Sequence, residues 1–258
     1  MEERQTLLEY ENMKKFLELL EENGMKEQKQ EVELLAGYVD KMEFQFNNVL
    51  DELKNVRQEL SAIQDKTIRA TATRAVDKVV HKVEDAKAHL VKLKNHIKET
   101  VDKAVTNFKE HGKSALVSAM KTLNVKGMLQ TIKDGLDQTV KVSDHGIDKL
   151  TKLGDEIHAV NSHMKNVGRV VIGKDTQDMN PRQADKGLLA KVQESLFFTM
   201  DVYSKMSLQT GQVLDKIKTI EEKHNDKKSV RSDLKDIRNK QQNGKAPSEK
   251  IRKEKELG

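Results

Sequence analysis

One short run in the chain has residue types and spacing that could bind a nucleotide. Residues 168–174 read Gly-Arg-Val-Val-Ile-Gly-Lys and fit the first seven positions of a P-loop, whose backbone amides cradle phosphates while its lysine reaches the terminal ones. The eighth position is Asp175 rather than the serine or threonine that binds magnesium. A P-loop also follows a β-strand, whereas Val167 and Val171 continue a helical pattern. We therefore interpret the run as a helix C-terminus capped by Gly173.

The histidines do not have the spacing of a helical metal site. His81, His89 and His96 are eight and seven residues apart, whereas such a site needs ligands three or four apart. The nearest pair, His158 and His163, is five apart, and the absence of cysteine excludes disulfides and thiolate ligands. No Ser-His-Asp arrangement, nucleophile elbow or dinucleotide fingerprint is present. We predict no enzyme activity, no catalytic, cofactor-binding or metal-ligating residue, and no cofactor.

Composition favours long helices over a compact globular domain. Charged residues make up 34% of the 258 residues and aromatic residues only 3%, with no tryptophan and two prolines. Helices can pack with little aromatic volume, because a narrow apolar stripe suffices when the partner is another helix. We predict an all-α protein with long amphipathic helices in an elongated antiparallel coiled coil or helical bundle, and no β-sheet.

The strongest pattern is a run of apolar residues whose spacing alternates four and three, the period of a coiled coil. It comprises Leu35, Val39, Met42, Phe46, Val49, Leu53, Val56, Leu60 and Ile63. A new phase begins at Val76, after a stretch, residues 65–75, that contains neither glycine nor proline. We therefore expect one continuous or mildly kinked helix over about 26–110, rather than two helices separated by a short break.

The remaining chain divides at glycines and polar runs. We expect a short amphipathic helix over 4–22, a short connecting helix over 113–124, a third long segment over about 125–172 and a fourth over about 181–223 that starts at Asn180-Pro181. The third segment has a clean apolar pattern only in its later part, at Leu150, Leu153, Ile157, Val160, Met164, Val167 and Val171. The predicted regions are 1–24 (N-terminal helix), 25–223 (bundle, with turns near 111–125 and 173–181) and 224–258 (a charged, largely disordered tail with a possible helix over 229–241).

Charge is unevenly distributed along the chain. Residues 1–65 carry 16 acidic and 8 basic side chains, residues 66–220 carry 18 and 27, and residues 221–258 carry 8 and 12. The acidic first part can pair with the basic part within the chain or between copies. The basic helices could also contact DNA phosphates, but acidic residues alternate with their lysines, which are Lys78, Lys82, Lys87, Lys92, Lys94 and Lys98.

The sequence predicts protein partners or self-association through the apolar stripes. Glu52 and Arg57 flank the 35–63 stripe with the spacing that suits a parallel homodimer, but three further stripes indicate that this helix packs first against its own chain. Nucleic-acid binding is a weaker alternative. Membrane contact is disfavoured, because the acidic N-terminus is unlike a signal peptide and no apolar run approaches the roughly 20 residues that cross a bilayer. We expect a cytoplasmic protein.

Several short runs carry a family resemblance: Gly24-Met25-Lys26, residues 49–53, Ala86-Lys87, Leu93-Lys94, residues 108–110, residues 112–116, residues 165–169 and Gly173-Lys174. With these residues the chain resembles an uncharacterised all-helical domain of unknown function, carried by conjugative and integrative elements of Gram-positive bacteria. The resemblance covers most of residues 1–195. It brings no established activity or site residues, and it implies a bacterial cytoplasmic setting beside transfer or maintenance proteins.

These observations lead us to expect a non-enzymatic coiled-coil scaffold or accessory interaction protein, as part of a bacterial mobile genetic element. Sequence-nonspecific DNA binding by the basic helices and tail is the first alternative. Peripheral binding to a lipid surface by the amphipathic helices is the second.

Overall fold

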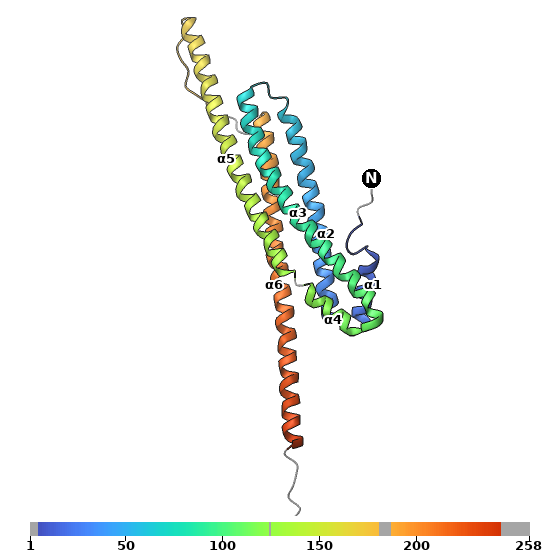
Figure 1. The fold of residues 1–258 in the computed structure, drawn as a ribbon. Helices are drawn as coiled ribbons and strands as arrows, with labels where there is room; N and C mark the ends of the chain where they lie inside the picture. Colours follow the sequence, from blue (N-terminus) through green and yellow to red (C-terminus); the bar gives the residue numbers. More distant parts are fainter. Residues whose placement is uncertain (1–4, 124, 181–186, 244–258) are drawn as a thin grey trace, which may run out of the picture. The chain divides into compact units, whose positions relative to one another are not determined.

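The computed structural model describes residues 5–123, 125–180 and 187–243, with side chains up to residue 219 except that of residue 188. Every regular element in these residues is a helix, which confirms the predicted all-α class. The helices are α1 (Glu11–Glu22), α2 (Lys26–Leu60), α3 (Lys66–His111), α4 (Lys113–Thr122), α5 (Lys126–Val171) and α6 (Leu188–Asn243) (Figure 1). The chain forms two compact units, Met1–Leu214 and Asp215–Gly258, and the packed helices belong to the first.

Helix α2 contains the first eight residues of the stripe that the sequence singled out, and the ninth, Ile63, follows the end of the helix. All nine side chains from Leu35 to Ile63 are buried, and the helix begins at Lys26, as its spacing predicted. The flanking residues Glu52 and Arg57 also contact the same chain: Glu52 accepts a hydrogen bond from Ser195 of α6, and Arg57 pairs with Asp77 of α3. The stripe therefore packs within the chain.

The prediction of one continuous helix over about 26–110 is wrong. Residues 61–65 separate α2 from α3, and successive tight-turn bonds from Ser61 N to Gln58 O and from Ile63 N to Leu60 O end the first helix. Asp65 then begins α3, because its carboxylate accepts the otherwise unpaired backbone N–H groups of Thr67 and Ile68. The phase change seen in the sequence is a hairpin between two helices.

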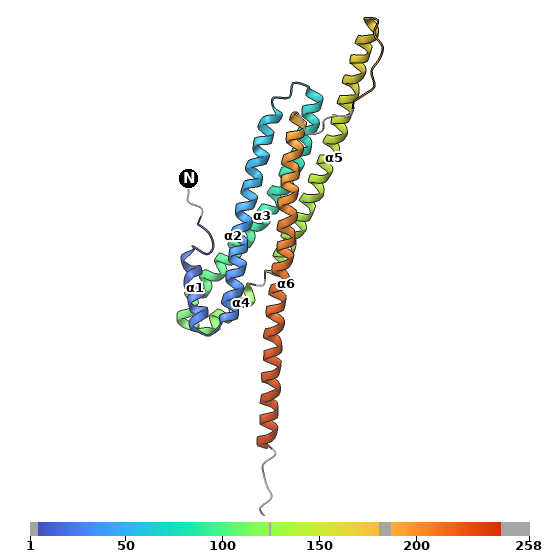
Figure 2. The ribbon, with the colours of Figure 1, turned by 180° about the vertical axis from the view of Figure 1, so that it is seen from behind.

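Four helices of the first unit form an antiparallel bundle, shown from two sides in Figures 1 and 2. The four helices are α2, α3, α5 and α6. Between each two neighbours, the contacting residues have rising numbers along one helix and falling numbers along the other, so neighbouring helices run in opposite directions. Helices α2 and α3 meet at Glu43–Lys94, Asn47–Lys87 and Arg57–Asp77. Helix α5 meets α3 at Gly135–Ala86 and Gly146–Ala75, and meets α6 at Asp137–Ser207 and Thr151–Gln193. Helix α6 meets α2 at Tyr203–Phe46 and Ser195–Glu52.

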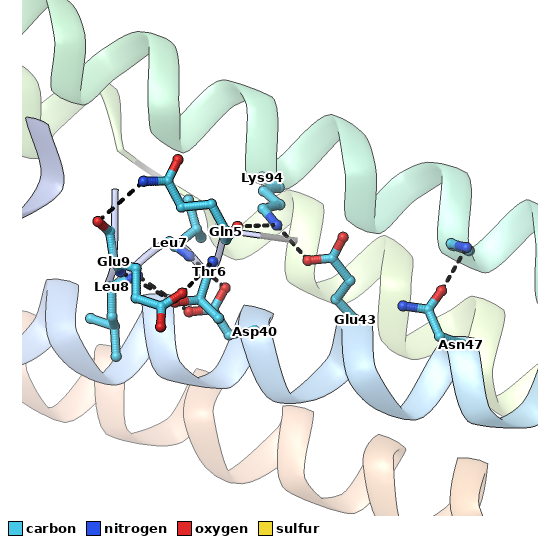
Figure 3. Close-up of polar contacts among 10 residues, drawn as sticks. Gln5, Thr6, Leu7, Leu8, Glu9, Asp40, Glu43, Asn47 and Lys94 are labelled. Atoms are coloured by element: carbon cyan, nitrogen blue, oxygen red, sulfur yellow. Dashed lines mark hydrogen bonds and ion pairs between the residues drawn. The ribbon is translucent and has the colours of Figure 1, made fainter. Parts of the chain in front are cut away.

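The N-terminal segment is attached to the bundle by polar contacts. Helix α1 begins at Glu11 rather than near residue 4, because Thr6 and Glu9 close a turn before it. The carboxylate of Asp40 on α2 accepts the backbone N–H groups of Leu7 and Leu8, and Lys94 of α3 binds both Glu43 and the Gln5 carbonyl (Figure 3). Leu7 is fully buried, so the segment adds apolar as well as polar contacts.

The fourth long helix starts later and ends later than predicted. Helix α6 begins at Leu188, after Gly187 with φ of 98°, and Pro181 of the predicted start lies outside the described residues. Residues 224–243 are helical, where the sequence suggested a largely disordered tail with a possible helix over 229–241, and residues 244–258 lie outside the described part of the chain. In that described part, no helix is both long enough and apolar enough to cross a bilayer.

Candidate interaction surface

The P-loop-like run ends a helix in the way that the sequence indicated. Gly173 has a φ of 74°, its N–H binds the Val170 carbonyl, and the Lys174 N–H binds the Arg169 carbonyl. This pair of bonds is the Schellman motif, in which a left-handed glycine closes the last helical turn. A phosphate site needs backbone N–H groups directed at the ligand, whereas these two already bind helix carbonyls.

Most of the basic side chains that the sequence proposed for DNA binding contact their own chain. Lys94 binds Glu43, Lys87 donates to Asn47, Lys82 pairs with Asp85, and Lys98 lies over the Tyr10 ring at 4.9 Å from its centroid. Lys78 and Lys92 are exposed. Three of the six lysines, Lys87, Lys94 and Lys98, therefore contact α2 or the N-terminal segment, while Lys82 pairs within α3.

The histidines are also placed along helices rather than in one cluster. His89 contacts the Asp85 carbonyl one turn back, His96 contacts the Thr122 carbonyl of α4, and His158 contacts the Asn180 carbonyl. His81 is exposed. Among the residues that the structure describes, no three histidine or carboxylate side chains gather in a way that could hold a metal ion.

A groove of about 440 Å³ lies between the C-terminal part of α3 and α4. Its lining contains no phenylalanine, tyrosine or tryptophan and no large apolar side chain, unlike a typical small-molecule pocket. Its polar groups contact each other: Lys103 pairs with Glu99, and Thr100 donates to the His96 carbonyl. The lining residues are His96, Glu99, Thr100, Lys103, Ala104, Asn107, His111, Ser114, Ala115, Ser118, Ala119 and Thr122.

Helix α5 holds the feature with the clearest capacity to bind a partner. One uninterrupted heptad register runs along the helix. Its first half is buried in the bundle at Leu129, Ile132, Leu136, Thr139, Ser143, Gly146 and Leu150. In the same register the second half exposes what we call the α5 stripe, at Val160 (56%), Met164 (68%), Val167 (64%) and Val171 (79%). The half that is poorer in apolar residues is therefore the buried one.

The α5 stripe is exposed because the neighbouring helices end before it. Thr151 lies opposite Gln193, and α6 begins five residues before Gln193, so its start lies level with about residue 156 of α5. On the other side Gly146 lies opposite Ala75, and α3 begins nine residues before Ala75, so its start lies level with about residue 155. Among the described residues, no helix therefore lies beside α5 beyond about residue 156. In Figures 1 and 2 this half of α5 extends past the turn between α2 and α3.

The segment after α5 turns back along the helix without covering the α5 stripe. Asn166 exchanges two hydrogen bonds with the backbone of Gln177, Arg169 donates to the Asp175 carbonyl, and His158 contacts the Asn180 carbonyl. At about 100° per residue, these three helix positions are centred roughly 180° from the α5 stripe. The returning segment therefore braces one face of the helix and leaves the opposite, apolar face open.

The sequence identified the residues of the α5 stripe but not their exposure. We expected Leu150 to Val171 to pack against the other predicted helices, and only the N-terminal end of that run does so. A contiguous exposed apolar row at coiled-coil spacing is typical of an interaction site. Its exposure depends on where α3 and α6 begin beside α5, near residue 156, and no signal within the sequence of α5 marks that level.

The model of a family of unknown function, DUF6674, matches residues 9–256. No curated protein and no solved structure matches the chain.

Proposed function

The chain belongs to DUF6674, a family of unknown function, and we propose that it is a non-enzymatic coiled-coil scaffold or accessory protein that binds a helical partner through the α5 stripe. The observation that supports this role most directly is the position of Val160, Met164, Val167 and Val171. These side chains continue the register of a packed helix beyond the last helix that could cover them.

The energetics favour a partner on this surface. Burying a valine or methionine side chain contributes about 1.5–3 kcal/mol relative to leaving it in water. A solvent-facing helix would gain solubility from polar residues at the same positions, whereas the first half of α5 buries Thr139 and Ser143. The exposed part of the α5 register is thus more uniformly apolar than the buried part, although folding of this chain alone does not require apolar residues there, and this supports a role in binding.

The braced geometry also suits a binding surface. Bonds from Asn166 and Arg169 to the returning segment hold the end of α5 in helical form. An isolated helical end of this length is marginally stable in water. Ordering the helix in advance lowers the entropy that a partner would otherwise have to overcome.

The cellular setting is part of the proposal. The resemblance of this chain to a family from conjugative and integrative elements supports a bacterial, cytoplasmic protein that works beside the transfer or maintenance proteins of such an element. Enzymatic activity has no support from the described geometry, because the polar clusters around Lys94, Asp102 and Asp137 link helices to one another.

The experiment that tests this function is capture from the native host with three versions of the full chain. The baits are the wild type, the double variant Met164→Glu/Val167→Glu and the control variant Leu208→Glu. Leu208 is a matched control because it is an apolar residue of α6 that is 65% exposed and lies outside the α5 stripe. We expect one or more proteins to be retained by the wild type and by Leu208→Glu and lost with the double variant. Equal retention by all three would reject the α5 stripe as the binding surface.

DNA and lipid binding remain alternative proposals with their own tests. A gel shift that weakens steeply with salt would support phosphate binding by the lysines of α3. Flotation with anionic vesicles would support lipid binding. Either result, if unchanged in Met164→Glu/Val167→Glu, would place the activity outside the α5 stripe.

A further inference from the structure

Met164 differs in its chemistry from the three other members of the α5 stripe. Those three are valines, whose hydrocarbon side chains mild oxidants leave unchanged, whereas a methionine thioether is oxidised to a sulfoxide. We propose that Met164 is a redox-sensitive modification site, at which a peroxide forms the sulfoxide and thereby weakens binding of a helical partner to the stripe. This inference rests on the proposed function, since it adds a means of regulating the same surface.

Solvent exposure distinguishes Met164 from most methionines of the chain. Its side chain is 68% exposed, and among the described residues only Met179 is comparable, at 53%. Met13, Met42 and Met206 are fully buried, and the other described methionines are buried or half-buried. Because the sulfur must meet the oxidant in solution, Met164 and Met179 should react first in the folded protein.

The reactive sulfur atoms of this chain are limited to methionine. The sequence contains no cysteine, which is the other side chain whose sulfur peroxides oxidise. No thiol therefore competes with Met164 for the oxidant. Met179 lies in the segment after α5 and outside the stripe, so Met164 is the exposed methionine whose oxidation changes the proposed binding surface.

Oxidation of Met164 introduces a polar group in the middle of an apolar row. Val160 lies one helical turn before it and Val167 one turn after it, and neither valine side chain has a hydrogen-bond donor for the new S=O oxygen. A polar group that is buried without a partner opposes association. The affinity of a helical partner should therefore fall at least about tenfold.

The same oxidation should leave the fold unchanged. No described helix lies beside α5 at the level of Met164, since α3 and α6 both begin near the level of residue 156. The returning segment is bound through Asn166 and Arg169 on the opposite face of α5. The modification thus acts on an exposed surface and not on the core.

Oxidation by hydrogen peroxide forms one S–O bond and breaks the O–O bond. The sulfur loses two electrons, the peroxide gains them, and a water molecule leaves. In the reverse reaction, which methionine sulfoxide reductases catalyse, a dithiol supplies two electrons and becomes a disulfide, and the oxygen leaves as water. Because the chain contains no cysteine, a dithiol reductant has no disulfide to break in it.

Peptide mass spectrometry of the full chain after brief treatment with hydrogen peroxide tests the site. We expect Met164 and Met179 to be converted to the sulfoxide while Met13, Met42 and Met206 remain reduced, and we expect the circular dichroism to match that of the untreated chain. Equal oxidation of Met164 and the buried methionines, or loss of helix when Met164 is oxidised, would overturn the inference.

Capture from the native host tests the effect on binding, with each bait compared before and after oxidation. The baits are the wild type, Met164→Leu, which replaces the thioether by an apolar side chain of similar volume, and Met179→Leu as the matched control. Oxidation should lower retention at least about tenfold for the wild type and Met179→Leu but not for Met164→Leu. Reductases for both sulfoxide epimers, supplied with a dithiol, should restore retention by the wild type.

Oxidation of other methionines occurs in all three baits, so the comparison isolates Met164. Retention by the wild type that is unchanged after oxidation, or that reductase treatment does not restore, would overturn the switch. An equal loss of retention with Met164→Leu would also overturn it.

The two proposals can fail separately. If the reduced wild type retains host proteins through the stripe and oxidation of Met164 does not release them, the switch is wrong and the scaffold role stands. If the reduced wild type retains nothing that depends on the stripe, the proposed function fails and the switch fails with it, even where Met164 is oxidised first.

Discussion

Gly146 of α5 and Leu196 of α6 are in such close contact that a β-carbon at Gly146 would lie 3.1 Å from the Leu196 Cδ1 atom. On the other side the same β-carbon would lie 3.8 Å from the Ala75 Cβ atom of α3. Gly146 therefore allows three helices of the bundle to meet at one level, which explains a glycine in a helix interior despite its cost of about 1 kcal/mol relative to alanine.

The first prediction concerns this contact. Gly146→Val should destabilise the protein by about 1–3 kcal/mol, because the added methyl groups must displace a fully buried leucine in a close-packed core. Gly211→Val is the matched control, since a β-carbon there would meet only the flexible end of Lys133 at 3.7 Å. It should stay within about 0.5 kcal/mol of the wild type. Urea unfolding followed by circular dichroism measures both, and equal losses would contradict the packing.

Two buried tyrosines should respond in opposite ways to loss of the hydroxyl group. Tyr38 donates to the Met206 carbonyl at 2.9 Å and contacts the Thr210 hydroxyl at 2.6 Å. The hydroxyl of Tyr203 is buried without a hydrogen-bond partner among the described residues, while its ring packs edge-on against Phe46. Tyr38→Phe should cost about 1–2 kcal/mol, and Tyr203→Phe should be neutral or stabilising. Thermal unfolding at neutral pH compares them, and a clear loss for Tyr203→Phe would contradict this assignment.

Alkaline pH should weaken the bundle through Tyr38. Burial raises the pKa of Tyr38 to about 12 from its ordinary value of 10, although the bond to Thr210 acts in the other direction. Between about pH 10 and 12 the folded protein keeps the Tyr38 proton, whereas the unfolded chain loses it. The contribution of Tyr38 to stability is therefore complete below about pH 10. It should fall by up to about 2.7 kcal/mol as the pH rises to about 12. Burial also raises the pKa of Tyr203, so Tyr38→Phe should reduce the slope of stability against pH without abolishing it. An unchanged slope would contradict the role of Tyr38.

The sequence predicted which residues are buried better than it predicted where helices end. The stripe of α2 is buried from Leu35 to Ile63, because burial of one helix face depends on periodicity that the sequence contains directly. The break at residues 61–65 was missed because it needs no glycine or proline. The start of α3 depends on Asp65, which caps the helix. An aspartate is present in the sequence at this position, but one capping residue by itself does not predict a helix start. The exposure of Val160 to Val171 was not predictable from α5, since it results from where α3 and α6 begin.

The N-terminal segment should detach when Asp40 is replaced. Asp40→Ala removes the acceptor of the Leu7 and Leu8 backbone N–H groups, so we expect a loss of about 1–2 kcal/mol. Cleavage by protease within residues 5–10 should also be faster. Asp51→Ala changes an exposed carboxylate on the same helix and should leave both measurements close to the wild type. Protection that persists in Asp40→Ala would show that burial of Leu7 alone holds the segment.

The last prediction separates folding from binding along α5. Ser143 is buried with no partner for its hydroxyl in the described part of the chain, so Ser143→Ala should stabilise the protein by about 1 kcal/mol, by removing an unpaired polar group and favouring the helix. Thr139 on the same stripe donates to the Gly135 carbonyl, and Thr139→Val should therefore have little net effect. Neither change should alter retention of host proteins by the α5 stripe, because both residues lie in the packed half. If Ser143→Ala raised the unfolding temperature and also reduced this retention, the two halves of α5 would be coupled, and the division of the register into a folding half and a binding half would be wrong.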